Sequence, residues 1–264
     1  EYRRLDKLDE SVFRKIRAVY LGMTSYVDWM LGHVLDALDA TGLTERTTMI
    51  VTSDHGDFAG DYGLVEKWSN CFCDAMTRIP LLIRTPGGQA GHVVHEQVEM
   101  FDIMATVLEL AGLEANHTHF SQSLLPQLRG APGDPARAVF GSGGYNADET
   151  HCLTGREPDD PLRDPTNVYW PQTMLRLEHP ESYARTACIR TNDWKLVHRP
   201  REVSELYDLQ NDPNEMTNLW NTPEAQAVQH EMLQRLLDRM IVTSDVVPFE
   251  ADDRAWDPSL SREI

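Results

Sequence analysis

The chain has 264 residues, 41% hydrophobic and 25% charged, which is enough for one large or two modest domains with real cores. Its 42 acidic residues against 24 basic ones give a formal net charge of −18, which argues against a broad nucleic-acid-binding surface. No apolar run is long enough to predict a membrane span, and four irregularly spaced cysteines do not predict a disulfide scaffold.

The first part of the chain, residues 1–120, has the pattern of an α/β core. Apolar residues recur every three or four positions from Asp9 to Ala40, which predicts a long helix. A run rich in β-branched residues at 47–52 predicts a strand covered on both faces in a parallel sheet, and a second buried strand is predicted at 79–84. Asp102 is predicted to cap a further helix, which Gly112 ends.

The second part, residues 121–264, predicts a small antiparallel sheet with one helix packed on it. Strands are predicted at 137–140, 184–189, 194–198 and 206–209. The polar segment 141–180 is interpreted as a long surface excursion, and the acidic tail 244–264 is expected to wrap the surface. A helix is predicted to begin at Thr222, with a buried stripe formed by Val228, Met232, Leu236 and Met240.

The strongest functional signal lies where the predicted strand at 47–52 ends, in the run Thr52-Ser53-Asp54-His55-Gly56-Asp57. Open α/β sheets place their chemistry at such strand ends. Asp54 offers carboxylate oxygens and His55 an imidazole nitrogen, so the pair could bind one divalent cation. A Ca²⁺ ion needs six or more donors, so other ligands must come from elsewhere. Taken alone, the pattern favours an ordinary turn beside a surface histidine.

The wider context changes this interpretation. The stretches 51–57, 60–67 and 77–87, with 20–28, 101–112 and 206–213 matching in the same order, closely resemble the C-terminal half of the sulfatase family. The resemblance implies an alkaline-phosphatase-like three-layer α/β sandwich with a small C-terminal subdomain. It also implies an enzyme that hydrolyses sulfate esters of small molecules or saccharides.

The resemblance assigns roles to three residues. Asp54 and His55 match the positions of metal ligands, usually of Ca²⁺, and Lys67 matches the lysine that contacts the sulfate, a catalytic and substrate-binding role. A cation and an ammonium would neutralise the sulfate oxygens during transfer. At Tyr62 the family more often has a histidine, so this loop departs from the family pattern.

One part of the family pattern is missing. Sulfatases use a formylglycine made from the Cys or Ser of a C/S-x-P-x-R motif, and the chain contains no such motif. We therefore expect the nucleophile and the remaining metal ligands on an N-terminal part of the same enzyme, upstream of residue 1. The alternatives are a phosphodiesterase or phosphonate monoester hydrolase of the same superfamily, with Mn²⁺ or Zn²⁺ in place of Ca²⁺, and a non-catalytic sulfatase-like chain.

Overall fold

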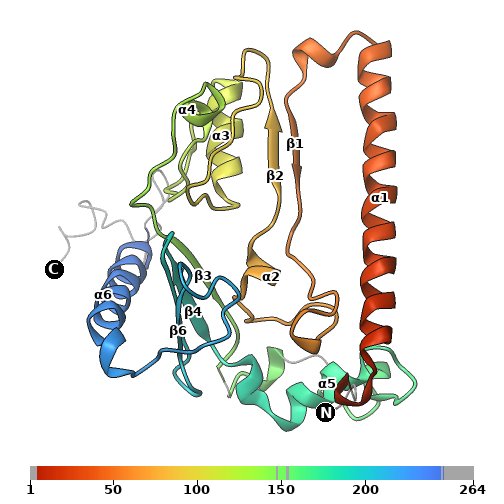
Figure 1. The fold of residues 1–264 in the computed structure, drawn as a ribbon, viewed down its shortest axis with the longest axis vertical. Helices are drawn as coiled ribbons and strands as arrows, with labels where there is room; N and C mark the ends of the chain where they lie inside the picture. The colour runs from red at the N-terminus through yellow and green to blue at the C-terminus, as the bar shows by residue number, and fades with distance from the viewer. Residues whose placement is uncertain (1–4, 147, 153–154, 245, 247–264) are drawn as a thin grey trace, which may run out of the picture.

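The computed structural model describes residues 5–146, 148–152, 155–244 and 246. Its first element is the long helix α1, Glu10–Ala40, which the sequence predicted. The Asp9 carboxylate accepts a hydrogen bond from the backbone N–H of Ser11 at 2.8 Å, which satisfies one of the free donors at the helix start. None of the residues of α1 is buried. As viewed in Figure 1, α1 stands alongside the strand β1.

The strands β1, Met49–Thr52, and β2, Leu81–Arg84, form an antiparallel pair. The parallel sheet expected from the sequence is therefore wrong for these two strands. A parallel pair needs a crossover connection, usually a helix, whereas residues 53–80 return along a loop that carries only the three-residue 3₁₀ helix Asp61–Gly63 and the four-residue helix α2, Asp74–Thr77. The strand pair is also not covered on both faces by the described residues, because Leu82 in β2 is 63% exposed.

The helix α3, Asp102–Ala111, is followed by the short helix α4, Leu125–Leu128. Gly112 ends α3 with a φ of 67°, a conformation that suits glycine. Asp102 is the first helical residue rather than the N-cap, so that prediction was wrong by one position. Its fully buried carboxylate still accepts from the backbone N–H of Glu99 at 2.8 Å and pairs with Arg137 at 2.6 Å, which anchors the start of α3.

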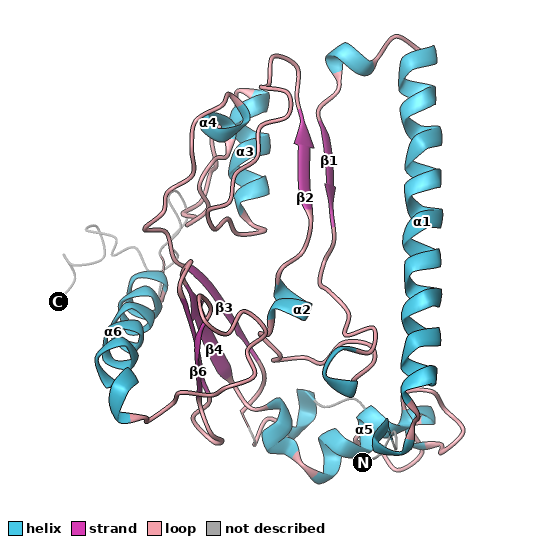
Figure 2. Cartoon of the chain, viewed as in Figure 1, coloured by secondary structure: helices cyan, strands magenta, loops and turns pink. Residues whose placement is uncertain are grey.

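The predicted antiparallel sheet is formed by the strands β3, Val139–Gly143, β4, Thr186–Arg190, β5, Trp194–His198, and β6, Glu205–Asp208. The strands lie side by side in sequence order. The helix α6, Gln226–Thr243, packs on this sheet, as Figure 2 shows. Its main buried contacts come from Met232 and Leu236, which confirms the centre of the predicted stripe.

The predicted start of this helix is confirmed: Thr222 is the N-cap of the 3₁₀ helix Pro223–Ala225, which has Pro223 in its first turn and continues directly into α6. The far end of the predicted stripe was wrong. Met240 is 45% exposed, and the neighbouring Arg239 places its guanidinium over the rings of Phe120 and Phe140.

The segment 141–180 is not only a surface loop. It contains the end of β3 and a further helix, α5, Trp170–Glu178, which the polar, proline-rich sequence did not reveal. The acidic tail, apart from Ser244 and residue 246, lies outside the described residues. Within the described ranges, no helix combines the length and the apolar character needed to cross a bilayer.

Candidate functional site

The backbone turns sharply directly after β1, and this turn sets the side chains of Asp54 and His55. The hydroxyl of Ser53 donates to the carbonyl oxygen of His55 at 2.7 Å, and the backbone N–H of His55 donates to Oδ1 of Asp54 at 3.0 Å. That N–H bond lowers the pKa of Asp54 below its ordinary value, so the group is a carboxylate at neutral pH. The side chain of Asp54 is 81% exposed and is free to accept further ligands.

The ring of His55 has a defined orientation. Its Nδ1 lies 2.8 Å from the carbonyl oxygen of Gly56, which can only accept, so Nδ1 carries a proton and donates it. The lone pair of Nε2 then faces Oδ2 of Asp54 at 3.3 Å and Nζ of Lys67 at 2.9 Å. The structure therefore brings together the three residues that the sequence singled out.

The donor set suits a divalent cation as part of a larger shell. A carboxylate oxygen and an imidazole lone pair, both acceptors, converge on one position, and the ammonium of Lys67 lies beside them. Metal-bound histidines commonly donate their second ring nitrogen to a backbone carbonyl, as His55 does here. Among the described residues there is no group of three His, Cys, Asp or Glu side chains that could hold a metal.

Gly56 is required by close packing against α2. Its N–H donates to the carbonyl oxygen of Met76 at 2.8 Å, and a Cβ added at this position would lie 1.9 Å from the carbonyl oxygen of Ala75. No other residue can approach a backbone so closely. The helix α2 thus supports the residue whose own carbonyl orients His55.

The loop between Gly56 and Cys71, which carries Lys67, has unusual backbone geometry. Four non-glycine residues have a positive φ in it: Ala59, Tyr62, Glu66 and Asn70. Each such residue costs about 1 to 3 kcal/mol and persists where the surroundings fix it. Strained conformations of this kind cluster at functional sites.

Three separate parts of the chain fix this loop. Arg17 of α1 pairs with Asp61, and the hydroxyl of Tyr62 donates to the carbonyl oxygen of Asn214 at 3.0 Å. The amide of Gln172 in α5 donates to the carbonyl oxygen of Lys67 at 3.4 Å. Tyr62, which replaces the histidine more usual in the family, therefore has a structural partner.

The sequence did not identify a buried charged cluster behind α2, formed by Asp74, Arg190, Lys195 and Glu215. The one available signal was Lys195, a lysine inside an otherwise apolar strand. Lysine is almost never fully buried unless it is paired, and its partners here are far away along the chain.

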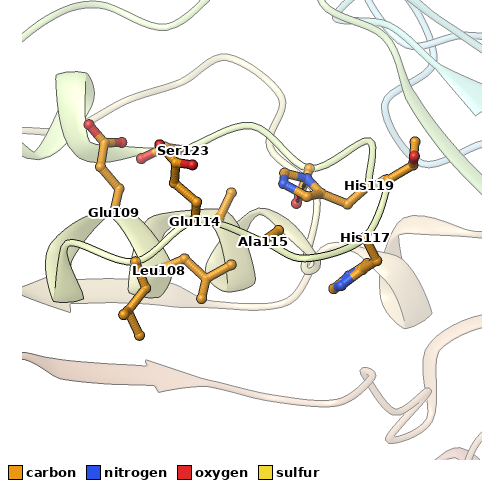
Figure 3. A pocket seen from close by; sticks show the side chains of 11 residues that line it. Leu108, Glu109, Glu114, Ala115, His117, His119 and Ser123 are labelled. Carbon is orange, nitrogen blue, oxygen red and sulfur yellow. Dashed lines mark hydrogen bonds between the residues drawn. The ribbon is translucent and has the colours of Figure 1, made fainter. Parts of the chain in front are cut away.

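Two pockets in the described structure offer space for a ligand. The larger, about 450 Å³, lies beside α3, and none of Asp54, His55 and Lys67 lines it. Figure 3 shows Glu109 and Glu114 at one end of it and His117 and His119 at the other. The lining of a smaller pocket, about 140 Å³, includes Ser69, which follows Lys67 by two positions in the sequence. Its lining also includes Asn70, Tyr145, Arg176 and Tyr183.

The chain is similar to several known proteins. Residues 2–113 match the Sulfatase family model, and residues 162–241 match the model of the N-sulphoglucosamine sulphohydrolase C-terminal region. Arylsulfatase K of Bos taurus is 29% identical over 244 residues, covering 91% of this chain and 40% of the relative. The multifunctional alkaline phosphatase superfamily protein PehA of Trinickia caryophylli is 30% identical, covering 90% of this chain and 43% of the relative.

Among solved structures, phosphonate monoester hydrolase SpPMH from Silicibacter pomeroyi has a TM-score of 0.72 at 28% identity, covering 92% of this chain and 44% of that one. The predicted class, an α/β fold of the alkaline-phosphatase type, is confirmed by this similarity. Within that class the chain is similar to sulfatases, through the two family models and the curated relatives described above. It spans about two fifths of the length of the curated relatives described above.

Proposed function

We propose that this chain supplies part of the active site of a metal-dependent sulfuric ester hydrolase. Asp54 and His55 are the proposed ligands of a divalent cation, and Lys67 is the proposed sulfate contact. The proposal rests on the contacts of Nε2 of His55, which lies 3.3 Å from Oδ2 of Asp54 and 2.9 Å from Nζ of Lys67. Each group on its own would be an ordinary surface side chain.

The proposed chemistry is electrostatic. When bound, a divalent cation would neutralise sulfate oxygens and stabilise the charge that develops during transfer. The proposed ion is Ca²⁺, because carboxylate oxygens are its preferred ligands, and Mn²⁺ and Zn²⁺ are alternatives because His55 contributes nitrogen. Lys67, with its fixed positive charge, would bind a second sulfate oxygen, and such preplaced charges supply much of the catalysis in comparable sites.

The formylglycine nucleophile and the other metal ligands are proposed to lie on an N-terminal part of the same enzyme. One observation supporting this partner is the apolar stripe of α1, whose side chains are exposed in the described structure: Val19, Met23, Tyr26, Val27, Met30 and Val34. Exposed apolar surfaces of this kind mark interaction sites. The boundary between the proposed parts 1–120 and 121–264 stays a prediction.

The proposed substrate is a sulfate ester of a small molecule or a saccharide. The smaller pocket supports this class: its lining includes Ser69, two residues after the proposed sulfate contact, and the aromatic residues Tyr145 and Tyr183, a residue type that packs against aryl and sugar groups.

Two experiments test the proposal. The isolated 264 residues should not hydrolyse an aryl sulfate, whereas the protein with its N-terminal part should, and turnover by the isolated chain would contradict the proposal.

The second experiment compares the turnover of an aryl sulfate with that of an aryl phosphate and a phosphonate monoester, and measures the bound metal. Preference for the phosphonate ester would support the rival function, which the similarity to a phosphonate monoester hydrolase favours. Failure of the complete protein to bind any divalent metal would support a non-catalytic chain.

A further inference from the structure

Asp74, the first residue of α2, is held by charged residues from the C-terminal sheet. Nζ of Lys195 in β5 donates to its Oδ1 at 2.5 Å. The guanidinium of Arg190 in β4 donates to both carboxylate oxygens, at 3.2 Å and 3.1 Å. Glu215 completes the cluster: its Oε1 accepts from Lys195 at 2.6 Å and from the backbone N–H of Asp74 at 2.9 Å. Two cations thus face two carboxylates.

This cluster is largely out of solvent. Lys195 is 1% exposed, and Glu215 is buried beside it. Burial by itself would raise the pKa of Asp74, but Lys195 and Arg190 hold that pKa below its ordinary value. Asp74 therefore remains a carboxylate. Because buried charges need every partner, removal of one member leaves another unpaired and loosens the attachment of α2.

The same short helix supports the corner that carries His55. The carbonyl oxygen of Met76 in α2 accepts from the N–H of Gly56, and the Ala75 carbonyl fills the space where a Cβ of Gly56 would lie. The carbonyl of Gly56 in turn accepts from Nδ1 of His55. An unbroken series of contacts thus leads from Lys195 through Asp74 and α2 to the imidazole.

We infer that Lys195 and Glu215 are positioning residues for the metal corner. They fix α2 from the C-terminal sheet, and α2 fixes the position and ring orientation of His55. This inference rests on the proposed function, since it takes His55 as a metal ligand. Partners that orient a ligand typically contribute 10-fold to 100-fold in metal affinity. A purely structural cluster would change stability and leave metal affinity as it is.

The test uses the complete protein with the substitution Lys195→Met, which keeps an unbranched side chain, shorter by one atom, and removes the ammonium. The matched control is Arg137→Met, because Arg137 is also a buried cation that holds a helix start, pairing with Asp102 and Glu99 at α3. The dissociation constants for Mn²⁺ and Ca²⁺ are measured by titration at a temperature where circular dichroism shows each variant folded.

Both substitutions should lower the unfolding temperature, but only Lys195→Met should weaken metal binding, by about 10-fold or more. If Lys195→Met does not fold, Glu215→Gln decides, since it keeps an acceptor for the Asp74 N–H and removes only the charge; about a threefold to tenfold weakening is expected as part of that same range. Metal affinities within twofold of wild type in the folded variants would overturn the inference.

The outcomes separate this inference from the proposed function. Wild-type protein that binds metal but does not hydrolyse sulfate esters would overturn the proposed function, while the comparison of metal affinities would still decide the role of Lys195. Wild-type protein that binds no divalent ion would overturn both.

Discussion

Nζ of Lys67 lies 2.9 Å from Nε2 of His55, although the two residues are 12 positions apart and the loop between them contains several positive φ angles. This contact joins Lys67 to the corner formed by Asp54 and His55. The loop therefore places a fixed positive charge next to a carboxylate and an imidazole lone pair, an arrangement suited to binding an anion beside a cation.

The first prediction concerns Lys67 itself. In the complete protein, Lys67→Met should lower kcat/KM for an aryl sulfate by about 10²-fold to 10³-fold, because a preplaced charge at the sulfate is lost. Metal content should stay at the wild-type level, since Lys67 is not a ligand. Lys7→Met, at another exposed lysine, is the control and should change neither value. Activity of Lys67→Met within twofold of wild type would exclude a role at the sulfate.

The second prediction concerns the packing of Gly56 on α2. Gly56→Ala places a methyl group 1.9 Å from the Ala75 carbonyl oxygen, so the corner must move. We expect a loss of about 1 to 3 kcal/mol in the free energy of unfolding, together with weaker metal binding. Urea denaturation and metal titration measure the two effects.

Gly22 in α1 supplies the control for this substitution. None of the described residues lies within 4 Å of a Cβ added there, so in the isolated chain Gly22→Ala should stabilise the helix by about 0.5 to 1 kcal/mol. Equal stability changes for the two alanine variants would show that the contact between Gly56 and α2 is not tight.

The third prediction concerns the thiols of Cys71 and Cys73, whose sulfur atoms lie 3.2 Å apart. The hydrogen bond from Cys73 lowers the pKa of Cys71 to about 7, and the same contact raises the pKa of Cys73. The rate of Cys71 alkylation by iodoacetamide should therefore rise with a midpoint near pH 7. Cys73→Ala should move this midpoint upward, towards the ordinary thiol value.

The sign of the accompanying stability effect follows from the same shift. Because the folded-state pKa of Cys71 is lowered from 9.0, its stabilising contribution is fully present above about pH 9 and is lost as the pH falls through about 7. Cys188 serves as an internal control, since burial raises its pKa to about 12 and it should not react in the folded protein. Mass spectrometry identifies the modified residue, and faster labelling of Cys73 than of Cys71 would reverse the assignment.

The parts of the fold that were predicted correctly are encoded locally. The helix α1 follows from the spacing of its apolar residues, and the β4–β5 hairpin follows from two short strands around Thr191-Asn192-Asp193. The orientation of β1 against β2 was not encoded in this way, because an apolar strand does not specify its partner. It depends on the path of residues 53–80.

The same distinction applies to the site. Asp54 and His55 are neighbours in the sequence, so their pairing was visible, whereas Lys67 stood out only through the resemblance to a family. Lys195 lies 121 residues from Asp74 and 20 from Glu215, and no local pattern marks such partners. The buried cluster behind α2 therefore emerges only from the three-dimensional structure.

The most direct test of the central claim is the metal content of the complete protein with the substitution Asp54→Ala, measured by elemental analysis after dialysis. Because the carboxylate oxygen of Asp54 lies 3.3 Å from Nε2 of His55, its loss should leave the cation without one of its two proposed ligands in this chain. The wild-type protein should retain a divalent metal, and the Asp54→Ala protein should retain almost none. Full metal occupancy in the Asp54→Ala protein would contradict the assignment of this corner as a metal site.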